Sequence, residues 1–219
     1  MTPATASATS PTEDGLQGHS PEFLIRAFRL MYTSRRIDDR EILLKRQNKI
    51  FFQISGAGHE AIQVAAGLAL RPGHDWFYPY YRDRALALAV GVTPYEMMLQ
   101  AVGAASDSAS GGRQMPSHWS DPAKHIVAGS SPTGTHYGQA VGCAEASRYL
   151  GASPGKDGVV TLVCSGEGAT SEGEFWEAMN AACLSHAPVI FLVEDNGFAI
   201  SVPVERQTPG GNISEVVSG

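Results

Sequence analysis

The fold is decided by the stretch VTLVCSGEGATSEGEF, residues 160–175. The apolar run that opens it is typical of a strand buried in a parallel sheet. After a Gly-x-Gly turn, residues 174–186 predict a helix, which Ser171 and Glu174 are placed to begin with a capping box. A second apolar run at 188–196, PVIFLVEDN, predicts another buried strand. Strand, helix and strand in this order predict a right-handed βαβ unit, and therefore an α/β fold with a parallel sheet flanked by helices.

Two glycines, Gly166 and Gly168, lie where the first of these strands should end. Open α/β sheets bind their ligands at the carboxyl ends of the strands. Glycines at that place let an anion approach the backbone and the N–H groups of the helix that follows. The residue between them is an acid, Glu167, and the turn holds no lysine or arginine. A bound phosphate would therefore be repelled unless a divalent cation lay between the two negative charges.

Three kinds of phosphate site are compared with this turn. A Rossmann dinucleotide site needs G-x-G-x-x-G, but the third glycine is Gly173, two positions late, although Glu194 or Asp195 could bind the ribose. A Walker loop needs Gly-Lys-Ser/Thr, and the missing lysine excludes it. The third is a diphosphate bridged by Mg²⁺. The carboxylate of Glu167, the amide oxygen of Asn196 at the second strand end and a backbone carbonyl just after it suit that ion.

Composition sets limits on the class of protein. The chain has 219 residues, of which 43% are hydrophobic, enough for one sizeable domain with a buried core. Its net charge of −6 is not gathered in any block, which argues against a nucleic-acid partner. No apolar run is long enough to predict a membrane span. Three widely spaced cysteines, Cys143, Cys164 and Cys183, predict reduced core thiols in a cytoplasmic protein.

The middle of the chain reads as helices joined by long connections. Residues 59–70 predict one helix, and Thr93 with Glu96 form a capping box at the start of another. The segment 71–84, RPGHDWFYPYYRDR, reads as an aromatic-rich connection. Residues 103–134 form a long loop rich in glycine and serine, and loops of that length in a compact domain are usually functional or disordered.

Both ends of the chain carry expectations. Residues 1–19 are rich in Ser, Thr and Pro and predict a disordered tail, so that the domain spans 20–219. Ser20 and Pro21 are suited to begin a helix. At the other end a new helix begins after Gly211, and only two strands have been read. Because doubly wound sheets usually have more strands, we expect the domain to be truncated at its C-terminus.

A longer pattern resembles a known family. Residues 166–201, GEGATSEGEFWEAMNAACLSHAPVIFLVEDNGFAIS, resemble the thiamine diphosphate motif, in which Gly-Asp/Glu-Gly is followed by a long spacer and Asn. The stretch is most similar to the α subunit of the E1 component of 2-oxo acid dehydrogenase complexes. The motifs GAGHEA, YYRD, GGRQMP and SSPTGTH extend the resemblance over roughly residues 20–215. GRQMP and the Ser-Ser-Pro run are more similar to the branched-chain members than to the pyruvate members.

The resemblance implies roles for residues around the two strand ends. By similarity, Glu167 and Asn196 are Mg²⁺ ligands, with the main-chain oxygen of Phe198 as the third. The acid is usually Asp, although Glu occurs in branched-chain relatives, and the position of Phe198 is often Tyr. Tyr81 and Arg82 match positions that contact the diphosphate. There Arg82 would supply the cation that the glycine turn lacks.

Other residues match the family through shorter motifs. Three residues of the glycine turn would bind the diphosphate, the last two of them through main-chain groups: Gly166, Gly168 and Ala169. Two residues match a segment that meets the aminopyrimidine ring: Ser131 and Thr133. Four match a potassium-binding loop of some relatives, although the last replaces a more usual Gln: Ser130, Pro132, Thr135 and His136. Three fall where relatives line the acyl pocket, with plain core packing as the alternative: Phe51, Phe52 and Gln53.

The resemblance also implies a reaction and partners. Family members decarboxylate a small 2-oxo acid oxidatively and pass the acyl group to the lipoyl domain of an E2 partner. They bind thiamine diphosphate between an α and a β chain in an α2β2 assembly, and the β chain supplies the glutamate that activates the ring. An acid–base histidine lies in a later loop that nothing here matches, so no catalytic residue is assigned in this chain. The alternatives are a pyruvate dehydrogenase α subunit, a cofactor-binding or assembly module without activity, and a nicotinamide-dependent oxidoreductase.

Overall fold

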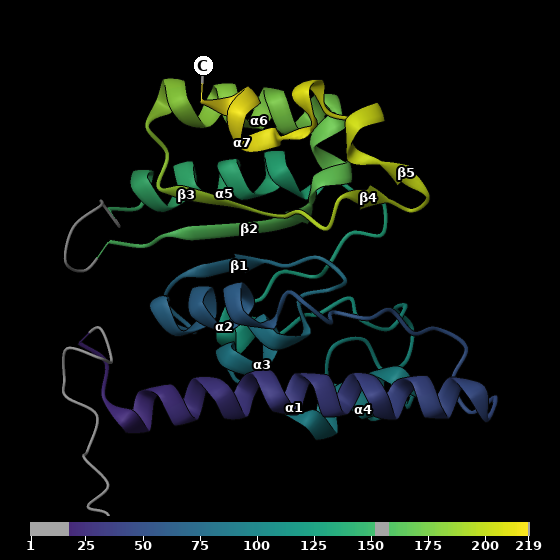
Figure 1. Ribbon diagram of the computed structural model, residues 1–219. Helices are drawn as coiled ribbons and strands as arrows, with labels where there is room; N and C mark the ends of the chain where they lie inside the picture. Colours follow the sequence, from purple (N-terminus) through teal and green to yellow (C-terminus); the bar gives the residue numbers. More distant parts are fainter. Residues whose placement is uncertain (1–17, 152–157, 219) are drawn as a thin grey trace, which may run out of the picture.

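The computed structural model describes residues 18–151 and 158–218 (Figure 1). The expected N-terminal tail falls outside this part of the chain, apart from Gly18 and His19. The domain boundary at residue 20 therefore stays a prediction.

Three parallel strands form the central sheet, in the order β1-β2-β3. They are β1 (Trp76–Tyr78), β2 (Thr161–Gly166) and β3 (Val189–Glu194). Strands β2 and β3 are the two that the sequence predicts, and they pair in parallel along their whole length, with Thr161 opposite Val189. The α/β fold with a parallel sheet is confirmed. Strand β1 lies within the aromatic-rich segment, so the prediction that this segment is only a connection was wrong.

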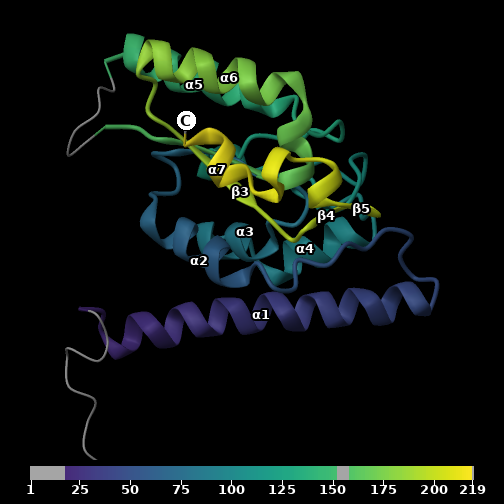
Figure 2. The same cartoon turned by 45° about the horizontal axis from the view of Figure 1, so that its top comes forward.

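Two layers of helices cover the sheet (Figures 1 and 2). One face carries α5 (His136–Tyr149), which precedes β2 in the chain, and α6 (Gly173–Ser185), which follows it. The other face carries α2 (Glu60–Ala69) and α3 (Arg84–Val90). The long helix α1 (Pro21–Arg46) packs on the outer side of α2 and α3.

Strand β2 is buried on both faces, which explains its continuous apolar sequence. Leu162 and Cys164 belong to the core on the side of α3, whereas Val163 belongs to the core on the side of α5 and α6. Side chains alternate across a strand in this way, so a central strand needs apolar residues at every position. All three cysteines are free thiols, but Cys183 is exposed and Cys143 only half-buried, so the prediction of core thiols holds fully for Cys164 alone.

Helix ends test the capping predictions. Ser20 caps α1 by accepting from the amide of Phe23, and Thr93 with Glu96 forms the expected capping box of α4 (Pro94–Ala101). The box expected at Ser171 is wrong. That residue belongs to the short 3-10 helix η3 (Glu167–Ser171), and α6 begins at Gly173 without a side-chain cap.

The chain beyond β3 forms short elements. A two-stranded antiparallel ribbon, β4 (Phe198–Ala199) and β5 (Val202–Pro203), is followed by η4 (Val204–Arg206) and η5 (Pro209–Gly211). The helix expected after Gly211 is present as α7 (Ile213–Val217), and η2 (Pro122–Lys124) interrupts the long loop. Within the described residues, no helix combines the length and apolar character of a membrane span. The cytoplasmic location stays a prediction.

Candidate functional site

A cavity of about 430 Å³ lies at the carboxyl ends of β2 and β3. This volume is within the usual range for a small-molecule site. Most of the cofactor and metal residues predicted from the sequence line it, together with residues that were not predicted: Ile54, Tyr80, Ser165, Ala199 and Ile200. The predicted residues that line it are Tyr81, Arg82, Thr133, His136, Gly166, Glu167, Gly168, Ala169, Asn196 and Phe198. Segments far apart in sequence therefore meet at one edge of the sheet.

Glu167 and Asn196 lie next to each other because the register pairs Gly166 with Glu194 at the ends of the two strands. The Glu167 side chain is only 1% exposed. Its Oε2 accepts from the backbone amide of Asn196 at 3.3 Å, whereas Oε1 is buried without a hydrogen-bond partner among the described residues. A buried carboxylate oxygen without a partner is costly, so a cation at this point fits the site.

The donor set matches the chemistry of Mg²⁺. Among the described residues that line the cavity, Glu167 is the one acid, so this site offers one carboxylate. The amide oxygen of Asn196 accepts from the backbone amide of Phe198 at 3.1 Å, which holds that oxygen and the following turn close together. Mg²⁺ is commonly bound by one or two carboxylates, with substrate phosphates and water completing the octahedron. The residues present therefore fit a metal that arrives with a diphosphate.

The glycine turn is held from outside by β4 and by Gln207. A Cβ atom at Gly168 would lie 2.8 Å from the Cβ of Ala199, closer than side chains approach. Gln207 donates to the carbonyl of Gly168 at 2.7 Å, and Thr170 donates to the carbonyl of Glu167 at 2.7 Å. Close packing against Ala199 therefore favours glycine at this position.

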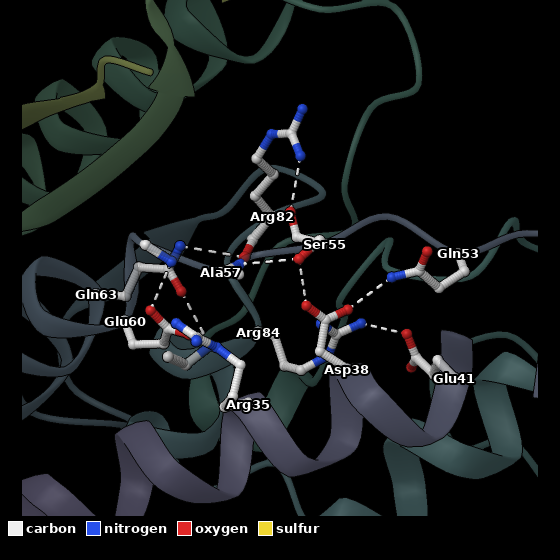
Figure 3. A network of polar contacts seen from close by, with 12 residues as sticks. Arg35, Asp38, Glu41, Gln53, Ser55, Ala57, Glu60, Gln63, Arg82 and Arg84 are labelled. Atoms are coloured by element: carbon white, nitrogen blue, oxygen red, sulfur yellow. Dashed lines mark hydrogen bonds and ion pairs between the residues drawn. The ribbon is translucent and has the colours of Figure 1, made fainter. Parts of the chain in front are cut away.

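Arg82 brings a cation to the cavity from the other half of the chain. Its Nη1 donates to the carbonyl of Ser55 at 2.7 Å (Figure 3). Its Cζ lies 5.4 Å from the ring centroid of Tyr81. Its own carbonyl accepts from the amide of Gln63 at 3.1 Å. Guanidinium groups have five N–H donors in a rigid fork, so donors remain for an anion.

Of the four residues predicted to bind potassium, three have oxygens close together and the fourth, His136, is bonded elsewhere. The hydroxyls of Ser130 and Thr135 are 2.6 Å apart, and Thr135 donates to the carbonyl of Pro132 at 3.0 Å. The imidazole of His136 lies instead against β2, where its Nε2 donates to the carbonyl of Cys164 at 2.7 Å. Burial lowers the pKa of His136, because it disfavours the charged form of the ring. Three oxygens therefore lie together, whereas the fourth residue is bonded elsewhere.

Ser131 is paired with a histidine that the sequence analysis did not assign. The Nδ1 of His118 lies 3.1 Å from the carbonyl of Pro116, and its Nε2 lies 2.8 Å from the hydroxyl of Ser131. Since a carbonyl only accepts, Nδ1 carries the proton and Ser131 donates to Nε2. The hydroxyl oxygen of Ser131 can therefore still accept a hydrogen bond, although Ser131 itself is not among the residues that line the cavity.

A buried polar group behind the cavity was also missed. Glu194 accepts from Gln63 at 2.8 Å and lies 3.3 Å from the Nδ1 of His59. Burial raises the pKa of Glu194, and burial followed by the charge of Glu194 raises that of Asp83 well above its ordinary value. The sequence analysis considered Glu194 only as a ribose ligand. Glu194 is the last residue of β3, and its burial against α2 depends on tertiary packing, which no local pattern indicates.

The residues predicted for the acyl pocket lie at the edge of the site. Phe51 is 90% exposed, and the amide of Gln53 donates to Asp38 at 2.6 Å rather than facing the cavity. From this segment, Ile54 is the residue that lines the cavity. The pocket role of Phe51, Phe52 and Gln53 stays a prediction.

Comparison with known proteins agrees with this geometry. The model of the dehydrogenase E1 component family matches residues 28–219. The chain belongs to the dehydrogenase E1 component family. The glycine turn, the strand-end asparagine and the arginine that meet at the cavity are thus all contained in the part of the chain that this family covers.

Named relatives carry branched-chain substrates in their names. The 2-oxoisovalerate dehydrogenase subunit alpha of Bacillus subtilis is 41% identical over 202 residues, 92% of this chain and 60% of the relative. The 3-methyl-2-oxobutanoate dehydrogenase subunit alpha of Mycobacterium tuberculosis is 34% identical over 200 residues, 91% of this chain and 50% of the relative. The mitochondrial 2-oxoisovalerate dehydrogenase subunit alpha of Caenorhabditis elegans is 36% identical over 170 residues, 78% of this chain and 38% of the relative. The chain thus spans 60% or less of the length of these relatives.

Proposed function

We propose that this chain forms the cofactor-binding part of the α subunit of a branched-chain 2-oxo acid dehydrogenase E1 component. The reaction is the oxidative decarboxylation of a branched-chain 2-oxo acid, with transfer of the acyl group to the lipoyl domain of an E2 partner. The observation that carries the proposal is the buried, unpartnered oxygen of Glu167 beside Asn196 at two neighbouring strand ends. Family membership and the names of the relatives support it.

The residues of this chain bind and orient the cofactor. Glu167, Asn196 and the carbonyl of Phe198 would hold Mg²⁺, and Arg82 would neutralise the diphosphate. Gly168 would let the diphosphate reach the backbone of the turn. When bound, thiamine diphosphate supplies a nucleophilic carbon for the 2-oxo group and an electron sink for the departing CO₂.

The active assembly includes a second chain. We propose an α2β2 heterotetramer, in which an E1 β subunit completes the site and supplies the acid that activates the thiamine ring. The cavity is lined by one carboxylate, from Glu167, and one guanidinium, from Arg82. No residue of this chain is assigned a proton-transfer role. Pyruvate is the second candidate substrate, and a module that binds cofactor without catalysis is the candidate from another class.

We also propose a potassium site, with three of the four ligand residues that the sequence predicts. We assign its ligands to the oxygens of Ser130, Pro132 and Thr135 only, because His136 is bonded to Cys164. Exchange of K⁺ for Na⁺ should lower the Tm of the protein. An unchanged Tm would refute this part of the proposal.

One experiment separates the candidates. The chain is co-expressed with an E1 β subunit, and decarboxylation of 2-oxoisovalerate, pyruvate and 2-oxoglutarate is measured with thiamine diphosphate and Mg²⁺. The expected result is a preference for 2-oxoisovalerate. Preference for pyruvate would support the second candidate, and cofactor binding without turnover the binding module. If NAD raises the Tm and thiamine diphosphate does not, the chain is not a thiamine enzyme.

A further inference from the structure

A buried ion pair joins α1 to α3 on the side of the sheet away from α5 and α6. Arg84 is 1% exposed, and its Nη1 lies 3.2 Å from the Oδ1 of Asp38 on α1. Its Nη2 forms a second ion pair with Glu41, one turn further along the same helix. Buried ion pairs are weak evidence for stability, because removing two charges from water offsets their attraction. Stability alone therefore does not explain why these charged residues are buried.

Asp38 differs from Glu41 in what else it contacts. Its Oδ1 also accepts from the amide of Gln53 at 2.6 Å, and its Oδ2 accepts from the hydroxyl of Ser55 (Figure 3). Both donors belong to the connection 51–58, which has no helix or strand of its own. Since that segment lacks a backbone ladder, the carboxylate of Asp38 fixes its position. Among the described residues, Glu41 makes no hydrogen bond to this segment.

The connection in turn fixes Arg82. The carbonyl of Ser55 accepts from the Nη1 of Arg82 at 2.7 Å. The next residue is Gly56, where a Cβ atom would lie 2.7 Å from the carbonyl of Arg82, so the two segments are in direct backbone contact. Gln63 holds the same carbonyl from the other side at 3.1 Å. Arg82 lines the cavity, so the orientation of its guanidinium depends on where Ser55 lies.

We propose that Asp38 is a positioning residue for anion binding: it holds Ser55, and the carbonyl of Ser55 holds the guanidinium of Arg82 toward the diphosphate. The inference rests on the proposed function, because the diphosphate is the anion. A long arginine side chain loses rotamer freedom when it binds a ligand, and a side chain already oriented loses less. Affinity for the cofactor therefore depends on a residue that does not touch it.

Two variants with matched chemistry test the proposal. Asp38→Asn and Glu41→Gln each remove one negative charge facing Arg84 at nearly constant shape, but only Asp38→Asn places an amide against the donors of Gln53 and Ser55. Ser55→Ala removes the hydroxyl and leaves the carbonyl, and it is a milder change that keeps the test open if Asp38→Asn does not fold. The Kd for thiamine diphosphate with Mg²⁺ is measured by titration calorimetry on the assembled protein, beside the Tm of each variant.

We expect Asp38→Asn and Ser55→Ala to raise the Kd about 10-fold, and Glu41→Gln less than about 2-fold. In an Arg82→Ala background the effect of Asp38→Asn should nearly vanish, because it acts through Arg82. Equal losses for Asp38→Asn and Glu41→Gln, or an undiminished loss without Arg82, would overturn the inference. Inorganic pyrophosphate with Mg²⁺ is the second probe. If pyrophosphate binds and responds to Asp38→Asn while thiamine diphosphate does not bind, the proposed function fails and the positioning role stands.

Discussion

Replacing Glu167 with glutamine should change cofactor binding and the stability of the free protein in opposite directions. The side chain is 1% exposed, and Oε1 has no partner within the described residues. The glutamine side chain has the same shape and keeps an oxygen for the amide of Asn196, 3.3 Å away. What it removes is the negative charge. Without metal that charge is a cost, and with metal it is the principal attraction.

The magnitudes follow from these contacts. Interactions of a charged group with its partner are worth about 1.5–3 kcal/mol, and 1.4 kcal/mol is tenfold in Kd. Glu167→Gln should therefore weaken Mg²⁺-dependent binding of thiamine diphosphate by roughly 100-fold. Without ligand, relief of the buried charge should leave the Tm unchanged or raise it by about 2–4 °C, the shift that corresponds to 1 kcal/mol in a domain of this size.

Calorimetric titration and thermal unfolding measure the two effects on one preparation. Glu174→Gln is the matched control, because it removes an exposed acid from the first turn of α6 without touching the cavity. The reasoning is refuted if Glu167→Gln binds the cofactor as the parent does. It is also refuted if the variant loses several degrees of Tm without ligand, since the carboxylate would then be stabilising the fold by itself.

Three further predictions concern the same surroundings. Arg82→Ala should raise the Kd for thiamine diphosphate at least 10-fold and leave kcat at saturating cofactor nearly unchanged, because phosphate positioning contributes uniform binding; a large loss of kcat with normal binding contradicts this. Gly168→Ala should cost about 1–3 kcal/mol of unfolding free energy by overpacking against Ala199, and an unchanged urea midpoint would disprove that contact. Burial, opposed by the charge of Arg84, raises the pKa of Glu41 from 4.5 to about 7. The folded state therefore favours the protonated carboxyl, and the stability that this protonation contributes is full below pH 4.5 and is lost as the pH rises through 7. Glu41→Gln should therefore gain Tm relative to the parent between pH 5 and pH 8, and a constant difference over that range would rule the shift out.

The parts of the fold that the sequence predicts are those that local patterns determine. The apolar runs of β2 and β3 and the capping box at Thr93 are properties of adjacent residues, and all three are confirmed. Strand β1 has only three residues and no alternation to read. It is a strand because it pairs with β2, from Trp76 opposite Thr161, a contact between residues far apart in the chain.

The failed capping box has a local cause of another kind. Ser171 and Glu174 have the right spacing for a box, but the Gly-Glu-Gly turn closes first into the 3-10 helix η3. The carbonyl of Glu167 accepts from the hydroxyl of Thr170, and with Glu172 at the N-cap the helix α6 starts one residue later than the spacing suggests. A motif that satisfies the rules for a helix start is thus overridden by a tighter turn that holds the site.

The same distinction applies to the site. The glycine turn and Asn196 are recognisable because each carries its own signature, whereas the residues that surround Arg82 come from elsewhere in the fold. Asp38 lies in the middle of α1 and Gln63 in the middle of α2, where an isolated polar residue looks like part of a solvated face. Their roles follow only from burial and from contacts with the connection 51–58 and with Arg82.

The charged side chains of the cavity come from two halves of the chain, and this makes the affinities for metal and for diphosphate depend on each other. Among the described residues that line the cavity, the sheet end offers a single carboxylate, Glu167, which is too little for tight Mg²⁺ binding without further oxygens. The other half offers Arg82, which attracts a diphosphate that Glu167 repels. Neither ligand is well bound alone, and each supplies what the other lacks. Because such coupling is reciprocal, the factor by which diphosphate tightens Mg²⁺ binding equals the factor by which Mg²⁺ tightens diphosphate binding. On the proposed function, the acid in the glycine turn would thereby make the binding of the organic cofactor conditional on the metal.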